Sequence, residues 1–179
     1  INPDFAEAFR TRGMLRSAQA SAWARAGRPV ETAYADALAA FDQAIRISPS
    51  NVQYWNHRAQ VRSNWAQIQA RQGQDPGLQL AGAEADFTRA LEINPALIDA
   101  FRGRGLLRAT AATLAMNRGE DPRKQFAAAI ADLREALALN ARDGESWMRL
   151  GFVLTNAGVF ELNRNGDAGD RFVQAAEAY

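Results

Sequence analysis

The chain has no cysteine and only one histidine, His57. Without thiols it can form neither disulfides nor thiolate metal sites, and one imidazole cannot supply a site with several histidine ligands. The sequence also lacks a phosphate loop, a dinucleotide fingerprint and a recognisable pair of nucleophile and base. We therefore expect no metal, no cofactor and no enzymatic activity within these residues.

Long hydrophobic runs and an excess of one charge are missing too. No apolar run reaches the roughly 18 residues of a membrane span. Lys and Arg number 21 against 20 Asp and Glu, a formal net charge of +1, whereas nucleic-acid-binding domains present a strongly basic face. We expect neither a membrane nor a nucleic acid as partner. The chain begins without a signal peptide and without Met, so we expect a cytoplasmic piece of a longer protein.

What the sequence does contain is an internal repeat with a period of 46 residues. A short motif of an aliphatic residue, Asn or Ser, and Pro or Ala marks each start. The four starts are Ile1-Asn2-Pro3, Ile47-Ser48-Pro49, Ile93-Asn94-Pro95 and Leu139-Asn140-Ala141. Numbering each copy from 1 gives repeat units 1–46, 47–92, 93–138 and 139–179, the last of them incomplete. Position 9 is always aromatic and position 13 always Gly or Ala, the large and small alternation that packed helices need.

Each unit is predicted to form two helices. Apolar and small residues recur at spacings of three and four, which define one face of a helix, over about positions 5 to 26 and about 30 to 46 of the frame. Between them lie a glycine suited to a helix end (Gly27, Gly73, Gly119) and a proline suited to a helix start (Pro29, Pro76, Pro122). Asp75 and Asp121 precede two of these prolines as N-caps. These breaks recur in every complete unit and argue against one long coiled coil. The pattern predicts a single all-α domain, 1–179, an α-solenoid of stacked antiparallel helical hairpins.

The repeated columns resemble the tetratricopeptide repeat over the whole chain. In the first unit the resemblance rests on an aromatic residue four before glycine, then alanine, aromatic and alanine, then a proline break: Phe9, Gly13, Ala37, Phe41, Ala44 and Ser48-Pro49. The resemblance implies a right-handed superhelix whose concave groove is lined by the first helices. The usual unit has about 34 residues, so this variant should have taller hairpins. An apolar column at position 34 (Tyr34, Leu80, Phe126, Phe172) predicts that the extension is packed.

Arginines form two columns on one side of the first helix, at positions 12 and 16 of the frame. The columns are Arg12, Arg58, Arg104 and Arg16, Arg62, Arg108. They could form a ladder that grips carboxylates or phosphates, or they could pair with acids of the second helix, for which Asp86 and Asp132 are placed. We favour the structural pairing. The fourth unit departs from both columns, with Leu150 and Leu154 in place of arginine.

Positions 7, 10, 11 and 14 correspond to the groove-lining face of the family. The candidate ligand-binding residues on this face are Arg10, Met14, Asn56, His57, Gln60, Arg102 and Arg149. For each of them an ordinary solvated side chain is the alternative. We interpret His57 as a polar groove or surface residue, because it has no evident partner for catalysis. Trp23 and Trp65 lie in the lengthened part of the hairpins, where we expect them to fill the core.

Three functions remain open from the sequence. The leading hypothesis is a scaffold that binds a peptide or protein segment, an acidic one in particular, in the concave groove. The second is a self-assembling module, a homo-oligomer formed through the exposed terminal hairpins. The third is a regulatory part of a larger signalling enzyme, by analogy with bacterial proteins in which such arrays are joined to kinases.

Overall fold

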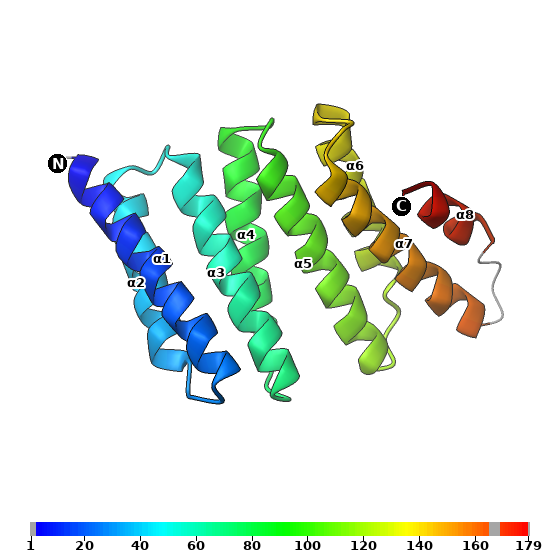
Figure 1. Ribbon diagram of the computed structural model, residues 1–179, viewed down its shortest axis with the longest axis horizontal. Coiled ribbons are helices and arrows are strands. Elements are labelled where there is room, and N and C mark those ends of the chain that lie inside the picture. Colours follow the sequence, from blue (N-terminus) through cyan, green and yellow to red (C-terminus); the bar gives the residue numbers. More distant parts are fainter. Residues whose placement is uncertain (1–2, 165–168, 179) are drawn as a thin grey trace. The chain divides into compact units, whose positions relative to one another are not determined.

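The computed structural model describes residues 3–164 and 169–178, and this part of the chain is built from α-helices without a strand (Figure 1). The helices are α1 (Pro3–Arg25), α2 (Glu31–Ile47), α3 (Val52–Arg71), α4 (Gly77–Ile93), α5 (Ile98–Asn117), α6 (Arg123–Leu139), α7 (Gly144–Asn163) and α8 (Gly169–Ala178). The all-α class is confirmed. From α2 onward, helices of the same kind begin 46 residues apart, at 31, 77, 123 and 169 and at 52, 98 and 144. No helix in the described part is both long and apolar enough to cross a membrane.

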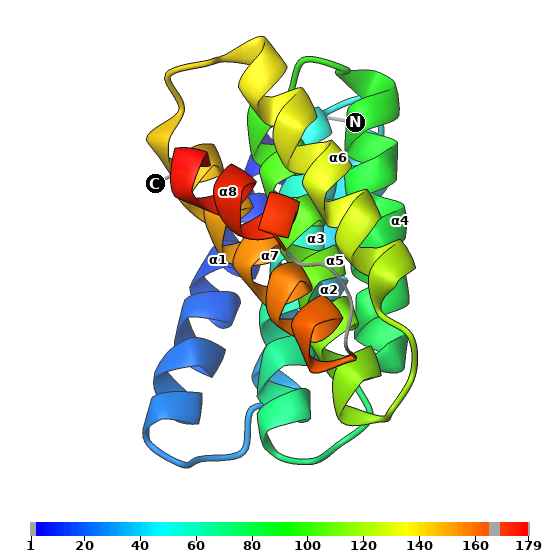
Figure 2. The same cartoon turned by 90° about the vertical axis from the view of Figure 1, so that its right-hand side faces the viewer.

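The helices pair in antiparallel hairpins that form two compact units, residues 1–95 and 96–179. In the first unit α1 packs on α2 and α3 on α4, and the two hairpins meet mainly through α2 and α3. The second unit repeats this plan, with α6 and α7 between the partners α5 and α8. Figure 2 shows the short α8 beside α7 at the C-terminal end.

The first helices end as the glycines predict. Gly27, Gly73 and Gly119 have φ values of +67°, +72° and +74°, a left-handed conformation that costs other residues free energy. The N–H that follows each glycine donates to a carbonyl five residues back, with N–O distances of 2.9 Å from Arg28 to Trp23 and 2.8 Å from Gln74 to Gln69. This pairing closes the last helical turn and sends the chain into the next helix.

The second helices begin immediately after the predicted prolines in two hairpins. α4 begins at Gly77, and the Asp75 carboxylate accepts from the Gly77 N–H at 3.1 Å. α6 begins at Arg123, whose N–H donates to Asp121 at 3.0 Å. The carboxylates therefore satisfy free N–H groups of the first turn, as the sequence indicated.

The alternation of large and small residues packs the two helices of a hairpin together. A Cβ added to Gly13 would lie 2.7 Å from the Cε2 atom of Phe41, and one added to Gly105 would lie 3.0 Å from Cγ of Leu133. The ring of Phe41 and the side chain of Leu133 are completely buried. Glycine in α1 and α5 thus lets the large residue of the second helix reach the helix backbone.

The lengthened ends of the hairpins are packed in the first unit. Tyr34 is fully buried and stacks on Trp65, with ring centroids 5.5 Å apart and planes at 9°. Trp23 and Trp65 lie against this cluster, half-buried, which agrees with the predicted core-filling role. Phe172, the last member of the same column, is 37% exposed. Its ring edge lies against Gly158 of α7, where an added Cβ would come within 3.1 Å of Cε1.

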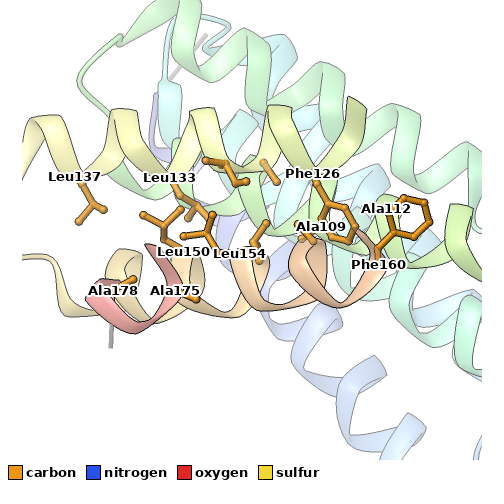
Figure 3. Packing of buried hydrophobic residues seen from close by; sticks show 14 residues of the cluster. Ala109, Ala112, Phe126, Leu133, Leu137, Leu150, Leu154, Phe160, Ala175 and Ala178 are labelled. Carbon is orange, nitrogen blue, oxygen red and sulfur yellow. The ribbon is translucent and has the colours of Figure 1, made fainter. Parts of the chain in front are cut away.

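The core of the second unit runs between α6 and α7. Figure 3 shows Leu133 and Leu137 of α6 beside Leu150 and Leu154 of α7, and Phe126 beside Phe160 towards the other end. Ala175 and Ala178 complete this core from α8. Small residues on α8 fit its close approach to α7.

Candidate binding surface

The arginine columns of the second and third repeat units are structural pairs. Arg58 donates from Nε at 2.9 Å and from Nη2 to the two carboxylate oxygens of Asp86, and Arg62 Nε donates to the same carboxylate at 3.2 Å. The Asp86 side chain is only 5% exposed. A buried carboxylate needs such charged partners, because its desolvation is otherwise uncompensated. The predicted pairing is confirmed here.

The same arrangement recurs between α5 and α6. Arg104 donates to Asp132 at 3.0 Å from Nε and 2.7 Å from Nη2, and Arg108 Nη1 donates at 2.8 Å. Both repeat units thus hold one buried aspartate between two arginines of the facing helix. These arginines are part of the fold and not a free cationic ladder.

The candidate groove residues of the first unit are spread over different environments. Arg10 donates from Nε to Glu7 at 2.7 Å on the same helix, and Met14 is 40% exposed. Asn56 is only 1% exposed, so its side chain lies in the interior and not on a free surface. His57 and Gln60 are half-buried, and the His57 ring lies 6.2 Å from that of Phe41.

Glu7, at position 7 of the groove-lining face, forms an ion pair with Arg10. The hydrogen bond from Arg10 holds the pKa of Glu7 below its ordinary value, helped by the positive charge of Arg10 and by the hydroxyl of Tyr54. Arg10 and Glu7 therefore stay ionised as a pair at neutral pH. A ligand carboxylate that sought Arg10 would have to compete with Glu7.

Two candidate arginines of the second unit are brought together by acids. Arg102 of α5 donates to Asp143 at 3.2 Å, and its Nη1 lies 2.8 Å from Glu145 of α7. Arg149 donates to Oε1 of the same Glu145, at 3.1 Å from Nε and 2.6 Å from Nη2. The Arg102–Glu145–Arg149 cluster links α5 to α7 and neutralises most of its own charge.

Asp143 anchors this cluster at the start of α7. Its carboxylate accepts from the N–H of Ser146 at 3.3 Å and from the Ser146 hydroxyl. The hydroxyl bond is the main reason why the pKa of Asp143 lies below its ordinary value, and the charge of Arg102 adds to it. Asp143 therefore caps α7 and orients Arg102 at once.

An exposed apolar stripe on α7 was not among the predicted site residues. Its members lie on one side of the helix at spacings that bring them into line. The stripe consists of Met148, Phe152, Val159 and Leu162, exposed by 55%, 51%, 40% and 58%. We call these four residues the α7 stripe. It lies next to Glu145 and Arg149, and exposed large apolar residues gathered in this way mark interaction surfaces.

A sequence signal for the α7 stripe exists in the repeat frame. At positions 10, 14 and 21 the fourth unit has Met148, Phe152 and Val159, whereas each other unit has polar residues at positions 10 and 21. The difference is visible only when the four copies are aligned. Among the described residues no group of three or more His, Asp or Glu side chains is placed to hold a metal ion.

Comparison with known proteins identifies the fold. The structure is similar to the TPR (tetratricopeptide repeat) domain of Arabidopsis OM64, with a TM-score of 0.60 and 18% identity over 87% of this chain and 99% of that one. It also matches the first TPR of Spaghetti (RPAP3) bound to the HSP90 peptide SRMEEVD, with a TM-score of 0.49 and 16% identity over 83% and 94% of the two chains. A MamA structure (MSR-1 C2) matches with a TM-score of 0.49 and 18% identity, over 89% of this chain and 72% of that chain. No family model and no curated protein matches the sequence.

Proposed function

We propose that this chain, which has the fold of a tetratricopeptide repeat domain, is a protein-binding module that holds a peptide or protein segment against the α7 stripe. The observation that carries the proposal is the line of four exposed apolar side chains on one face of a single helix. Met148 and Phe152 stand at frame positions 10 and 14, which line the binding groove in the resembled family, and Val159 and Leu162 continue the same side of the helix. A partner that covers them removes apolar surface from water, which is the main driving force of association.

The magnitudes favour apolar anchoring over capture of a carboxylate. Burying a side chain such as Phe152 or Met148 from water is worth about 1.5–3 kcal/mol each. Arg102 and Arg149 already share Glu145 at 2.8 Å and 2.6 Å, so an acidic partner residue would replace one ion pair with another. We infer that these arginines orient the segment through hydrogen bonds and that its apolar side chains supply most of the affinity.

A substitution in the stripe tests this function. Partners are first recovered with the full chain on a peptide array, and their affinities are then measured for the natural chain and for Phe152→Asp. Placing a carboxylate among the anchors should weaken binding by about 1.5–3 kcal/mol, roughly tenfold or more. Circular dichroism should show an unchanged fold, because Phe152 is 51% exposed.

Leu78→Asp provides the matched control. Leu78 is 77% exposed on α4, outside the stripe, so the same change of an exposed apolar residue into an acid should leave affinity unaltered. Arg10→Glu and Arg102→Glu examine the charged candidates in the two units separately. If every recovered partner binds Phe152→Asp as tightly as the natural chain, the α7 stripe is not the binding surface.

A further inference from the structure

A pocket lies at the lengthened end of the hairpins in the first unit, where α1, α2 and α3 meet. These three helices all contact one another (Figure 1). The pocket has a volume of about 460 Å³, and every residue that lines it stands between positions 18 and 34 of the repeat frame. It is therefore separate from the groove-lining positions 7, 10, 11 and 14 and from the α7 stripe of the other unit.

Two arginines form the charged part of the pocket wall. Arg25 is the last residue of α1 and Arg71 the last residue of α3, and both are exposed. Within the described part of the chain neither guanidinium takes part in a hydrogen bond or an ion pair, and none of the residues that line the pocket is acidic. Arg58 and Arg102, in contrast, are already neutralised by acids of the chain.

The position of these arginines at helix ends does not by itself explain them. A basic residue in the last turn interacts favourably with the negative end of the helix dipole. At the equivalent position 25, however, α5 and α7 carry Asn117 and Asn163, and neither helix has a basic residue in its last turn. The fold therefore does not require arginine there. Each helix end contributes about half a negative charge, and each guanidinium a full positive one, so the pocket remains positive.

Packing of a neighbouring hairpin does not supply the missing acid. Arg71 belongs to α3, against which α2 of the other hairpin packs, and its guanidinium still has no ion pair within the residues that the structure describes. On the same helix, Arg58 at position 12 pairs with Asp42 of α2. The contact between the two hairpins thus neutralises position 12 and leaves position 25 charged.

The rest of the pocket suits a peptide better than a small ion. Ala24 and Ile68 line it with apolar surface and pack against the cluster that contains the fully buried Tyr34. Asn64 and Gln67 line it with amide groups, which can both donate to and accept from a peptide backbone. A few polar groups placed beside apolar surface are typical of a binding pocket.

We propose that this pocket binds an acidic side chain in a peptide segment of a partner protein, with the carboxylate held by Arg25 and Arg71. A guanidinium suits this role because its planar group can donate two parallel hydrogen bonds to a carboxylate. The amides of Asn64 and Gln67 bind peptide groups next to the acid, and Ile68 contacts an apolar neighbour of it. The site lies within the first unit and does not rest on the function proposed for the α7 stripe.

An array of amidated and acetylated heptapeptides provides the probe. The peptides are printed in matched pairs that have Glu or Gln at the fourth position and the same uncharged residues elsewhere, and the pairs that bind the full chain are titrated by fluorescence anisotropy. We expect the natural chain to bind the Glu peptides roughly fivefold more tightly, since two partly exposed ion pairs each contribute modestly. The double variant Arg25→Gln and Arg71→Gln should lose this preference. High salt should reduce it in the natural chain, because salt screens exposed charges.

Arg46→Gln combined with Arg89→Gln is the matched control. It removes the same charge from two other exposed arginines of the first unit that lie outside the pocket, and it should keep the preference for Glu. Arg25→Glu combined with Arg71→Glu should reverse the preference, in favour of peptides with Lys at the fourth position. Circular dichroism should show the same helix content for every variant, because the replaced residues are exposed.

Three results would overturn the proposal. The first is equal affinity of the natural chain for the Glu and Gln peptides, or no binding of any pair. The second is a preference for Glu that survives in the variant with Arg25→Gln and Arg71→Gln. The third is binding of inorganic phosphate as tight as that of the best Glu peptide, which would make the occupant a free anion. Phe152→Asp should keep the preference for Glu, so this site and the α7 stripe can fail separately.

Discussion

Three frame positions, 12, 16 and 40, show how single residues define the character of each repeat unit. The second and third repeat units hold a buried aspartate between two arginines, and the fourth repeat unit replaces all three residues with Leu150, Leu154 and Ala178. The first repeat unit keeps both arginines but has Ala40 in the place of the aspartate. The charged and the apolar sets are alternative ways to fill the same space. In the first the buried charges are paired, and in the second there is no buried charge to pair. The first repeat unit lacks the aspartate of the charged set, because Ala40 stands in its place.

The buried triad leads to a prediction about stability. Asp86→Ala leaves Arg58 and Arg62 beside each other in a largely buried site, and we expect it to lower the free energy of unfolding by about 3–5 kcal/mol. The triple change Arg58→Leu, Arg62→Leu and Asp86→Ala copies the fourth unit. It should lie close to the natural chain or above it in stability, as apolar replacements of buried ion pairs often do. Equilibrium unfolding in urea measures both, and a triple variant as unstable as Asp86→Ala would contradict the interpretation.

At the scale of the element, helix ends depend on residues that act locally. The glycines with positive φ close α1, α3 and α5 in the same way, and Asp or Asn side chains cap the starts of α3 and α7. These features were predictable, since a left-handed turn and a free N–H group each demand particular residues. The lengthened hairpin uses the same kinds of glycine and cap residues at its helix ends, placed further from the start of the repeat unit.

The cap of α7 should make stability depend on pH. The pKa of Asp143 is held below its ordinary value of 3.8, so its contribution is present above that value and is lost as pH falls through the lowered pKa. At neutral pH we expect Asp143→Ala to cost about 1 kcal/mol through the lost cap. The difference from the natural chain should shrink towards acidic pH in thermal unfolding experiments.

Asn51→Ala is the control for this prediction. Asn51 caps α3 through a hydrogen bond from the Gln53 N–H at 3.0 Å, and its amide does not titrate. The cost of losing this cap should stay nearly constant over the same pH range. Equal pH profiles for the two variants would show that the Asp143 charge contributes nothing.

At the scale of the whole molecule, two compact units each combine two hairpins. Repeat proteins are stabilised by the hairpins themselves and by the contacts between neighbours. The last helix differs from the others, because α8 spans ten residues against 17 in α6, and its buried residues are Ala175 and Ala178. It therefore adds little apolar burial to the second unit.

Amide hydrogen exchange should reveal this difference in burial between α8 and α6. We expect α8 to open and exchange well before α6, because fewer buried contacts hold it in place. Mass spectrometry of peptides from Gly169–Ala178 and Arg123–Leu139 can compare the two helices directly. Equal protection of both would mean that α8 is held by more than the contacts described above.

The helices, their ends and their pairing within hairpins could be predicted from the residues alone. The period of 46 residues, the glycine and proline breaks and the alternation of large and small columns are local or periodic signals, and the structure reproduces them to within two residues wherever a helix end is described. The pairing of Asp86 with Arg58 was also predictable, because the repeat places both groups on facing helices. Composition and spacing were sufficient to predict a feature wherever it depends only on residues of the same hairpin.

Which side chains are exposed depends on how the helices pack, and the residues alone did not predict it. Asn56 is indistinguishable from a surface residue in the sequence, yet it is buried, and Arg102 is neutralised by Asp143 and Glu145 from another hairpin. Leu15 and Val61 occupy the same frame position, but one is 66% exposed and the other 2%. Exposure depends on whether a helix from the neighbouring hairpin covers the residue. Such covering depends on how the hairpins stack. Equivalent positions of a repeated sequence look alike in every repeat unit, but the folded chain covers them to different extents.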